Sequence, residues 1–147
     1  VGISNGTCFS PEGSILYFAD TMAETIYAYD LDLDSCDISN KRVFSNLKGH
    51  GYPDGSTVDA EGYVWNARWE AACVIRFSPD GEIDRIVNIP ASRVTCCAFG
   101  GANLDELYVT TSRMNVDPSE IEKHPQTGGL FALTPGVRGL PRAMFAG

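Results

Sequence analysis

The chain has 147 residues, 44% of them hydrophobic and 20% charged, with a formal net charge of -8 at pH 7. This length is enough for one ordinary domain with a sizeable core, and the acidic balance argues against a nucleic-acid partner, whose phosphates bind lysine and arginine. No apolar run approaches the roughly 20 residues that a membrane-spanning helix needs, so we expect no membrane partner.

The first 50 residues predict four short β-strands. Runs rich in β-branched and aromatic residues alternate with turn-forming residues, as in the turn Ser10-Pro11-Glu12-Gly13. The predicted strands cover residues 7–9, 16–19, 25–30 and 42–45.

The rest of the chain repeats this pattern twice. The apolar anchors Phe9, Val58 and Phe99 are spaced by 49 and 41 residues, within the range typical of solenoids and propellers, and four strands per unit favour propeller blades. We therefore predict an all-β fold, a β-propeller portion with about three four-stranded blades over residues 1–50, 51–92 and 93–147. The strands predicted in the second unit cover residues 56–58, 63–67, 73–77 and 83–89, and those in the third cover 95–99, 106–110, 129–133 and 143–146.

One helical signal interrupts the third unit. Asp117 could cap a turn or two over residues 118–124, with Pro118 at the first helical position. The surrounding loop is best interpreted as a lid or an edge cover. His50 and His124 lie in polar loops without an evident Asp or Ser partner, so neither is predicted to act in catalysis.

The five cysteines form no Cys-x-x-Cys pair. Cys8, Cys96 and Cys97 lie in predicted inner strands, where a cysteine behaves as a small hydrophobe, so we expect buried thiols. An odd count without a recognisable signal peptide favours a reducing cytoplasm, unless a leader precedes Val1.

Three polar residues stand at the same offset in the three units. Asn5, Asp54 and Thr95 each lie four residues before the apolar anchor. The first strand of every blade lines the channel of a propeller, so we expect these three residues to converge at one end. The loops expected to surround them are 20–24, 68–70 and 111–128.

Asn5 and Asp54 offer hard oxygen donors of the type that Ca²⁺, Mg²⁺ or Mn²⁺ prefers. Pro53 and Gly55 flank Asp54, which predicts a tight loop, so Asp54 should stand at the mouth of a strand rather than within it. A structural interpretation stays open at this point, because Asn and Asp beside glycine often satisfy the backbone groups of a turn.

Six short motifs follow one another through the chain: Ser4-Asn5-Gly6, Phe9-Ser10-Pro11-Glu12-Gly13, Leu16-Tyr17-Phe18-Ala19-Asp20-Thr21, Pro53-Asp54-Gly55, Val58-Asp59-Ala60-Glu61-Gly62 and Cys97-Ala98-Phe99-Gly100-Gly101. Together, and in this order, they resemble the SMP-30/gluconolactonase/regucalcin-like family. The match corresponds to the C-terminal half of that family's six-bladed propeller. The resemblance implies that about three blades are missing upstream, and that this missing N-terminal half is a partner without which the chain is inactive.

The same resemblance implies one divalent cation near the channel mouth, held by a Glu, an Asn and an Asp. Asn5 and Asp54 match the Asn and the Asp, whereas the Glu belongs to the family's first blade and has no counterpart here. Ca²⁺ is the expected ion, with Zn²⁺, Mg²⁺ and Mn²⁺ as alternatives. The implied reaction is hydrolysis of a sugar lactone, in which the metal polarises the carbonyl and activates water. Asp54 would act first as a ligand and second as a general base.

Thr95, Trp69 and Arg68 are the expected substrate contacts, although each could instead pack or lie solvated at the rim. Two other functions stay open. One is a non-catalytic calcium-binding propeller of the regucalcin type, which would use the same ligands. The other is a metal-free propeller that acts as a protein-interaction module.

Overall fold

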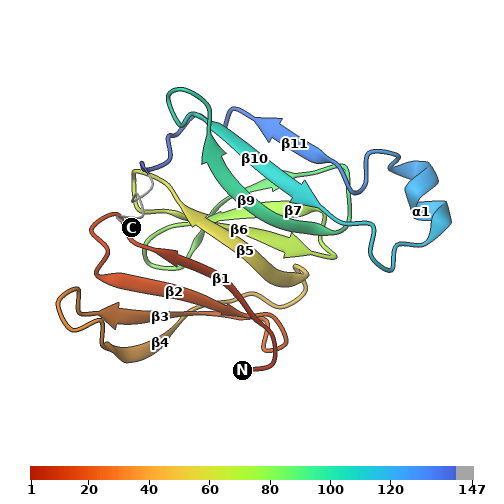
Figure 1. Ribbon diagram of the computed structural model, residues 1–147. Helices are drawn as coiled ribbons and strands as arrows, with labels where there is room; N and C mark the ends of the chain where they lie inside the picture. The colour runs from red at the N-terminus through yellow and green to blue at the C-terminus, as the bar shows by residue number, and fades with distance from the viewer. Residues whose placement is uncertain (142–147) are drawn as a thin grey trace.

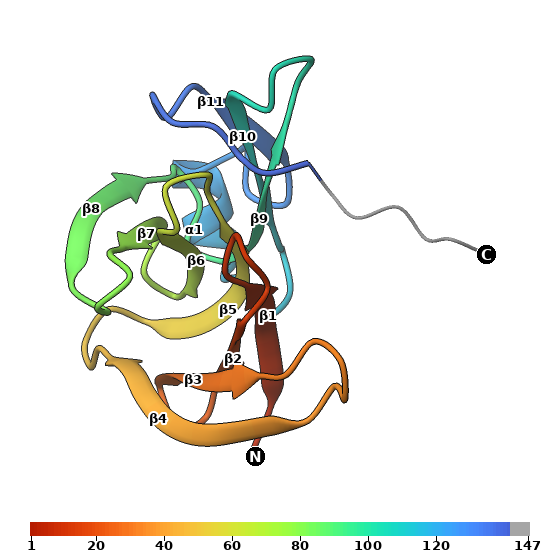
Figure 2. The same cartoon turned by 90° about the vertical axis from the view of Figure 1, so that its left-hand side faces the viewer.

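The computed structural model describes residues 1–141, which form three antiparallel sheets. The sheets fan out around the inner strands β1, β5 and β9, with β4 and β8 at the periphery (Figure 1, Figure 2). This arrangement confirms the all-β prediction. Within the described range, no helix is long and apolar enough to cross a membrane.

The first sheet, blade 1, consists of four strands that pair in sequence order. Its first turn shows why the chain reverses there: Gly13 has a φ of +80°, and the Ser10 hydroxyl accepts a hydrogen bond from Ile15 N at 3.0 Å. The strands are β1 (Ser4–Phe9), β2 (Ile15–Asp20), β3 (Thr25–Leu31) and β4 (Ile38–Asn46).

The second sheet, blade 2, is the most deeply enclosed, since its two central strands are buried on both faces. Its position between the other two sheets explains this burial. The strands are β5 (Tyr52–Val58), β6 (Val64–Trp69), β7 (Cys73–Phe77) and β8 (Ile83–Asn88).

The third sheet, blade 3, contains β9 (Val94–Gly100), β10 (Glu106–Thr111) and β11 (Leu130–Leu133). The strand expected over residues 143–146 lies outside the described residues. The predicted helix is confirmed as α1 (Pro118–Lys123), where the Asp117 carboxylate accepts a hydrogen bond from Ser119 N at 2.8 Å.

The blades are held together by two apolar layers. Between blades 1 and 2, Tyr17 and Ile26 pack with Ile75 and Phe77. Between blades 2 and 3, Trp65 is fully buried and meets Phe99 edge-to-face with ring centroids 6.0 Å apart. Each layer therefore forms only where two neighbouring sheets face each other.

Two expectations require correction. Asp54 lies within β5 rather than at its mouth, because β5 begins at Tyr52 and accommodates Asp54 in a register shift between Pro53 and Ser56. Of the inner-strand thiols, Cys8 and Cys97 are buried, and burial raises the pKa of Cys8 to about 12, but Cys96 is exposed.

Candidate active site

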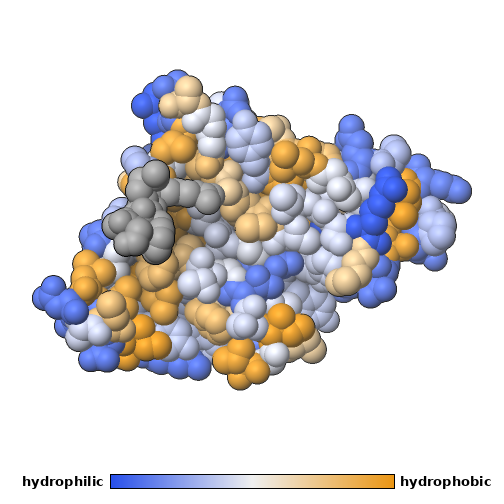
Figure 3. Space-filling model, in the orientation of Figure 1, coloured by the Kyte–Doolittle hydropathy of each residue, from blue (hydrophilic) through white to orange (hydrophobic). Residues whose placement is uncertain are grey.

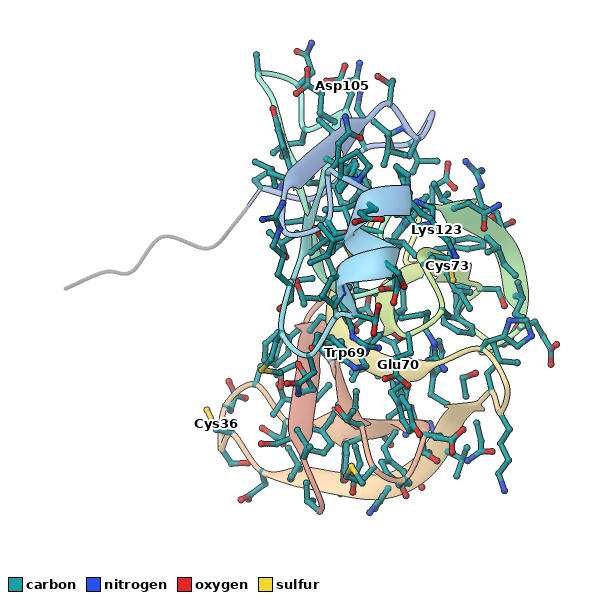
Figure 4. The ribbon with its side chains drawn as sticks, turned by 90° about the vertical axis from the view of Figure 1, so that its right-hand side faces the viewer. Cys36, Trp69, Glu70, Cys73, Asp105 and Lys123 are labelled. Carbon is teal, nitrogen blue, oxygen red and sulfur yellow. The ribbon has the colours of Figure 1, made fainter. Side chains whose placement is uncertain are left out.

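Residues near the start of β1 and β5 meet three loops at one end of the molecule. Figure 4 looks onto this end, with Trp69 and Glu70 near the centre and α1 above them. A cavity of about 480 Å³ opens there. Its walls come from the two inner strands and from the β2–β3, β6–β7 and β10–α1 loops, through Ile3, Asn5, Thr21, Met22, Tyr52, Asp54, Trp69, Glu70, Met114 and Asn115.

The structure places Asn5 and Asp54 on the wall of the same cavity, where the Asn5 side chain lies near enough to the Asp54 carboxyl group to lower its pKa. Each residue sits where its strand shifts register, Asn5 between β1 and β2 and Asp54 between β5 and β6. Thr21 links the two strands: it accepts a hydrogen bond from Asn5 Nδ2 at 3.4 Å and donates one to Pro53 O at 2.9 Å. Asp54 lies within the register shift of β5, Asn5 borders that of β1, and both residues line the same cavity.

The Asp54 carboxyl group is partly buried, and this burial raises its pKa. Hydrogen bonds from the Asn5 side chain and from the Gly55 backbone amide act in the opposite direction and lower it. The group is thus a carboxyl group with restricted hydration, with opposing influences on its pKa.

The pair fits part of a hard-cation site. Carboxylate and amide oxygens are the donors that Ca²⁺ and Mg²⁺ take. Within residues 1–141, no cluster of three or more His, Cys, Asp or Glu side chains could hold a metal ion. Asn5 and Asp54 would therefore be two members of a donor set whose remaining oxygens come from solvent or from other polypeptide.

Thr95 is not among the residues that line this cavity. It lies on β9, where its hydroxyl pairs with the Thr110 hydroxyl at 2.8 Å on the neighbouring strand. Asn5 and Asp54 therefore share this cavity, whereas Thr95 lies next to it on β9, whose neighbouring residue Cys96 packs against Gly55 of β5.

Trp69 lines the cavity, and its ring is braced by a residue that the sequence did not single out. The Arg93 guanidinium lies 5.0 Å from the Trp69 ring centroid and pairs with Glu70 at 2.5 Å. It also donates to Asn115 O at 3.2 Å. Arg93 therefore ties the end of β6 to the loop before α1, an arrangement that depends on contacts between distant segments and leaves no local sequence signal.

Arg68 does not lie at the rim as expected. It is 1% exposed, and its guanidinium donates to three main-chain carbonyls of the segment that leads into β5, those of Leu47, His50 and Gly51. Its fourth acceptor is Asn66 Oδ1 at 3.1 Å. The guanidinium is enclosed by protein and is not presented to the cavity.

A model of the SMP-30/gluconolactonase/LRE-like region matches residues 1–113. The chain belongs to this family. Regucalcin of Oryctolagus cuniculus is 39% identical over 150 residues, which cover 100% of this chain and 50% of the relative. Pentonolactonase XacC of Haloferax volcanii is 40% identical over 147 residues, covering 96% of this chain and 50% of that protein.

A solved member of the SMP-30/gluconolactonase/LRE-like family has the same arrangement of strands. The structure of a calcium-binding protein, regucalcin from Agrobacterium tumefaciens, superposes with a TM-score of 0.89 at 36% identity. The match covers 94% of this chain and 48% of that structure. The chain thus spans about half the length of the relatives it matches.

Proposed function

We propose that this chain is part of a hydrolase that opens sugar lactones with one divalent cation, and that Asn5 and Asp54 hold the cation. The observation that carries the proposal is that these two oxygen-bearing side chains, from neighbouring inner strands, line the same cavity. The similarity to a pentonolactonase, at 40% identity, supports the reaction class. Ca²⁺ is the first choice of ion, because a similar solved protein is described as calcium-binding.

Lactone hydrolysis adds water across the ring ester. The water oxygen bonds to the carbonyl carbon, the bond to the ring oxygen breaks, and the ring oxygen takes up a proton. A bound divalent cation supplies Lewis acidity towards the carbonyl oxygen. Asp54 would also accept a proton from the attacking water, and its restricted hydration favours this role. Trp69 would provide a flat wall for the sugar ring, and Thr95 a hydroxyl contact at the channel side.

The test compares Asp54→Asn with the unaltered protein in a pH-stat assay of aldonolactone hydrolysis, using the intact protein that contains this chain. We expect turnover to fall by at least about 100-fold, because the variant lacks both the charge on the ligand and the proton acceptor. Asp80→Asn is the matched control, since Asp80 is an exposed carboxylate in a turn that does not line the cavity. Full activity of Asp54→Asn at saturating metal would contradict the proposal.

A second function is a calcium-binding propeller without enzymatic activity. The regucalcin relatives favour it, and it uses the same two donors. Calcium titration combined with a panel of lactones separates the two functions, because this alternative predicts binding without turnover of any lactone.

We also propose that the remaining half of a six-bladed propeller completes the cavity and supplies the missing Glu ligand. The coverage of about half of each relative supports this. The 147-residue chain alone should then show no turnover, and addition of the other half should restore it. The odd number of cysteines supports a cytoplasmic location, which cell fractionation would test.

A further inference from the structure

The backbone of β5 lacks its normal pairing at the candidate ligand. Pro53 pairs with Arg68 and Ser56 pairs with Asn66, so that two residues of β5 lie opposite one residue of β6. Asp54 and Gly55 are the two residues in this bulge. A bulge leaves part of the ladder unpaired, so another donor is needed for the carbonyl groups at this point.

The Asn66 side chain provides that donor. Its Nδ2 donates to Asp54 O at 3.0 Å and contacts Ser56 Oγ at 2.9 Å, and Gly55 O is 3.5 Å away. Asn66 is 0% exposed, so no water can replace the amide without rearrangement. The amide thus fixes the conformation of the bulge from the β6 side.

Arg68 in turn orients the Asn66 amide. Its Nη1 donates to Asn66 Oδ1 at 3.1 Å, which leaves Nδ2 directed at β5. The same guanidinium binds the carbonyl of Gly51 at 2.8 Å and that of His50 at 2.9 Å, just before β5 begins. The Arg68 side chain therefore binds both the segment before β5 and Asn66, which supports the bulge in β5.

The opposite side of the bulge is equally confined. A Cβ atom on Gly6 would lie 2.6 Å from Asp54 O and 2.7 Å from Ser56 Oγ, so β1 packs directly against the groups that Asn66 binds. Gly6 follows Asn5, the other candidate ligand at the wall of the cavity. A small shift of the bulge would therefore change the distance between the two candidate ligands.

A comparison within blade 2 separates this arrangement from ordinary core stabilisation. Arg76 is also buried, but it pairs with three carboxylates, those of Asp59, Glu61 and Asp84. No ion pair of Arg68 with a carboxylate occurs in the part of the chain that the structure describes, and burial lowers the pKa of Arg68 to about 10. The donors of Arg68 are used on main-chain carbonyls before β5 and on Asn66, and not on an ion pair.

We propose that Asn66 and Arg68 are positioning residues, which hold the bulge at Asp54 in the conformation that brings its carboxylate to Asn5 and to a divalent cation. The cation is part of the proposed function, on which this inference rests. Groups that orient a metal ligand typically change metal affinity by about 10- to 100-fold when removed.

The first measurement is the calcium affinity of the intact protein by titration calorimetry. We expect Asn66→Leu and Arg68→Met each to weaken binding by about 10- to 100-fold, and Arg68→Lys, which can still reach some of the carbonyls, to weaken it less. Arg76→Met is the matched control: it should lower the melting temperature and leave calcium affinity within about twofold. Folded Asn66→Leu and Arg68→Met variants with unaltered affinity would overturn the proposal.

The second measurement needs no metal. Amide hydrogen exchange across residues 50–57 should be faster in metal-free Asn66→Leu than in the unaltered protein, and unchanged in Arg76→Met. Asn66→Ser serves the same purpose if the leucine variant does not fold. Equal exchange in both proteins would overturn the inference. An unaltered protein that binds no calcium would instead refute the proposed function, and hydrogen exchange would still decide the positioning role.

Discussion

Gly55 sets how closely two inner strands approach. A Cβ atom at this position would lie 2.5 Å from Cys96 Sγ and 2.8 Å from Cys96 Cα, so β5 and β9 touch through backbone at this point. A larger residue would have to push the strands of blades 2 and 3 apart.

We therefore predict that Gly55→Ala lowers the free energy of unfolding by about 1–3 kcal/mol, the usual cost of overpacking. Chemical denaturation of the intact protein would measure this. The substitution should also reduce calcium affinity, because Gly55 lies beside Asp54 in the register shift of β5. Unchanged stability would mean that the strands separate without cost.

The common offset of Asn5 and Asp54 before an inner strand predicted that they lie at the same end of the molecule, and both line the cavity there. The sequence was not sufficient for Arg68, which was expected at the rim. The partners of Arg68 are carbonyl oxygens, and every residue has one, so no residue type in the loop before β5 marks the contact. Asn66 escaped notice for a similar reason, since its role depends on a bulge in the neighbouring strand.

At the scale of elements, strands β5 to β8 are joined by a buried ionic network. Asp59 is fully buried and accepts hydrogen bonds from Trp65 Nε1 at 2.8 Å and from Arg76 Nε at 2.9 Å. Asp59 also stabilises the turn between β5 and β6, because its carboxylate accepts a hydrogen bond from Tyr63 N at 3.0 Å. Its other partners, Trp65 and Arg76, lie on β6 and β7. Which face of the sheet their side chains occupy depends on the strand register, which the sequence does not reveal.

This network predicts a pH dependence of stability. The hydrogen bond from Arg76 lowers the pKa of Asp84, so the folded protein binds this proton less readily than the unfolded chain. The stability that Asp84 contributes is therefore fully present above its unfolded pKa of about 4 and is lost as the pH falls through the lower, folded value. We expect the melting temperature to fall less between pH 5 and pH 3 in Asp84→Asn than in the unaltered protein. Identical slopes in a series of thermal melts would refute this, and Asp80→Asn provides the control.

The bounds of strands were harder to predict than their number. β1 and β5 begin before the predicted runs, at Ser4 and Tyr52 respectively. At these positions Gly6, Pro53 and Gly55 interrupt the alternating pattern, and glycine and proline ordinarily indicate a loop. The bulges accommodate them within the sheet, which periodicity alone does not reveal.

At the scale of the whole molecule, the two outer sheets each have a neighbour on one side only. Apolar side chains remain exposed on them, among them Val43 at 60% and Leu130 at 65%. Figure 3, which views the side of the inner strands, shows apolar residues interspersed among polar ones on this surface. The repeat spacing predicted such stacked sheets, but it could not show which faces stay uncovered.

We predict that the 147-residue chain alone associates with itself, because open sheet edges and apolar faces pair with other chains. Sedimentation velocity should give a mass above the 15.9 kDa of one chain. Val43→Lys combined with Leu130→Lys should shift the distribution towards the monomer, whereas a monomeric unaltered chain would refute the prediction.

The two tryptophans lie in different environments, so their intrinsic fluorescence can report on the cavity. Trp65 is sealed between blades 2 and 3 and should emit at short wavelength whatever occupies the cavity. Trp69 borders the cavity beneath the Arg93 guanidinium, so a molecule that enters would displace solvent from its indole and alter its emission. Occupancy by ion or sugar could thus be followed by intrinsic fluorescence, without attaching a dye.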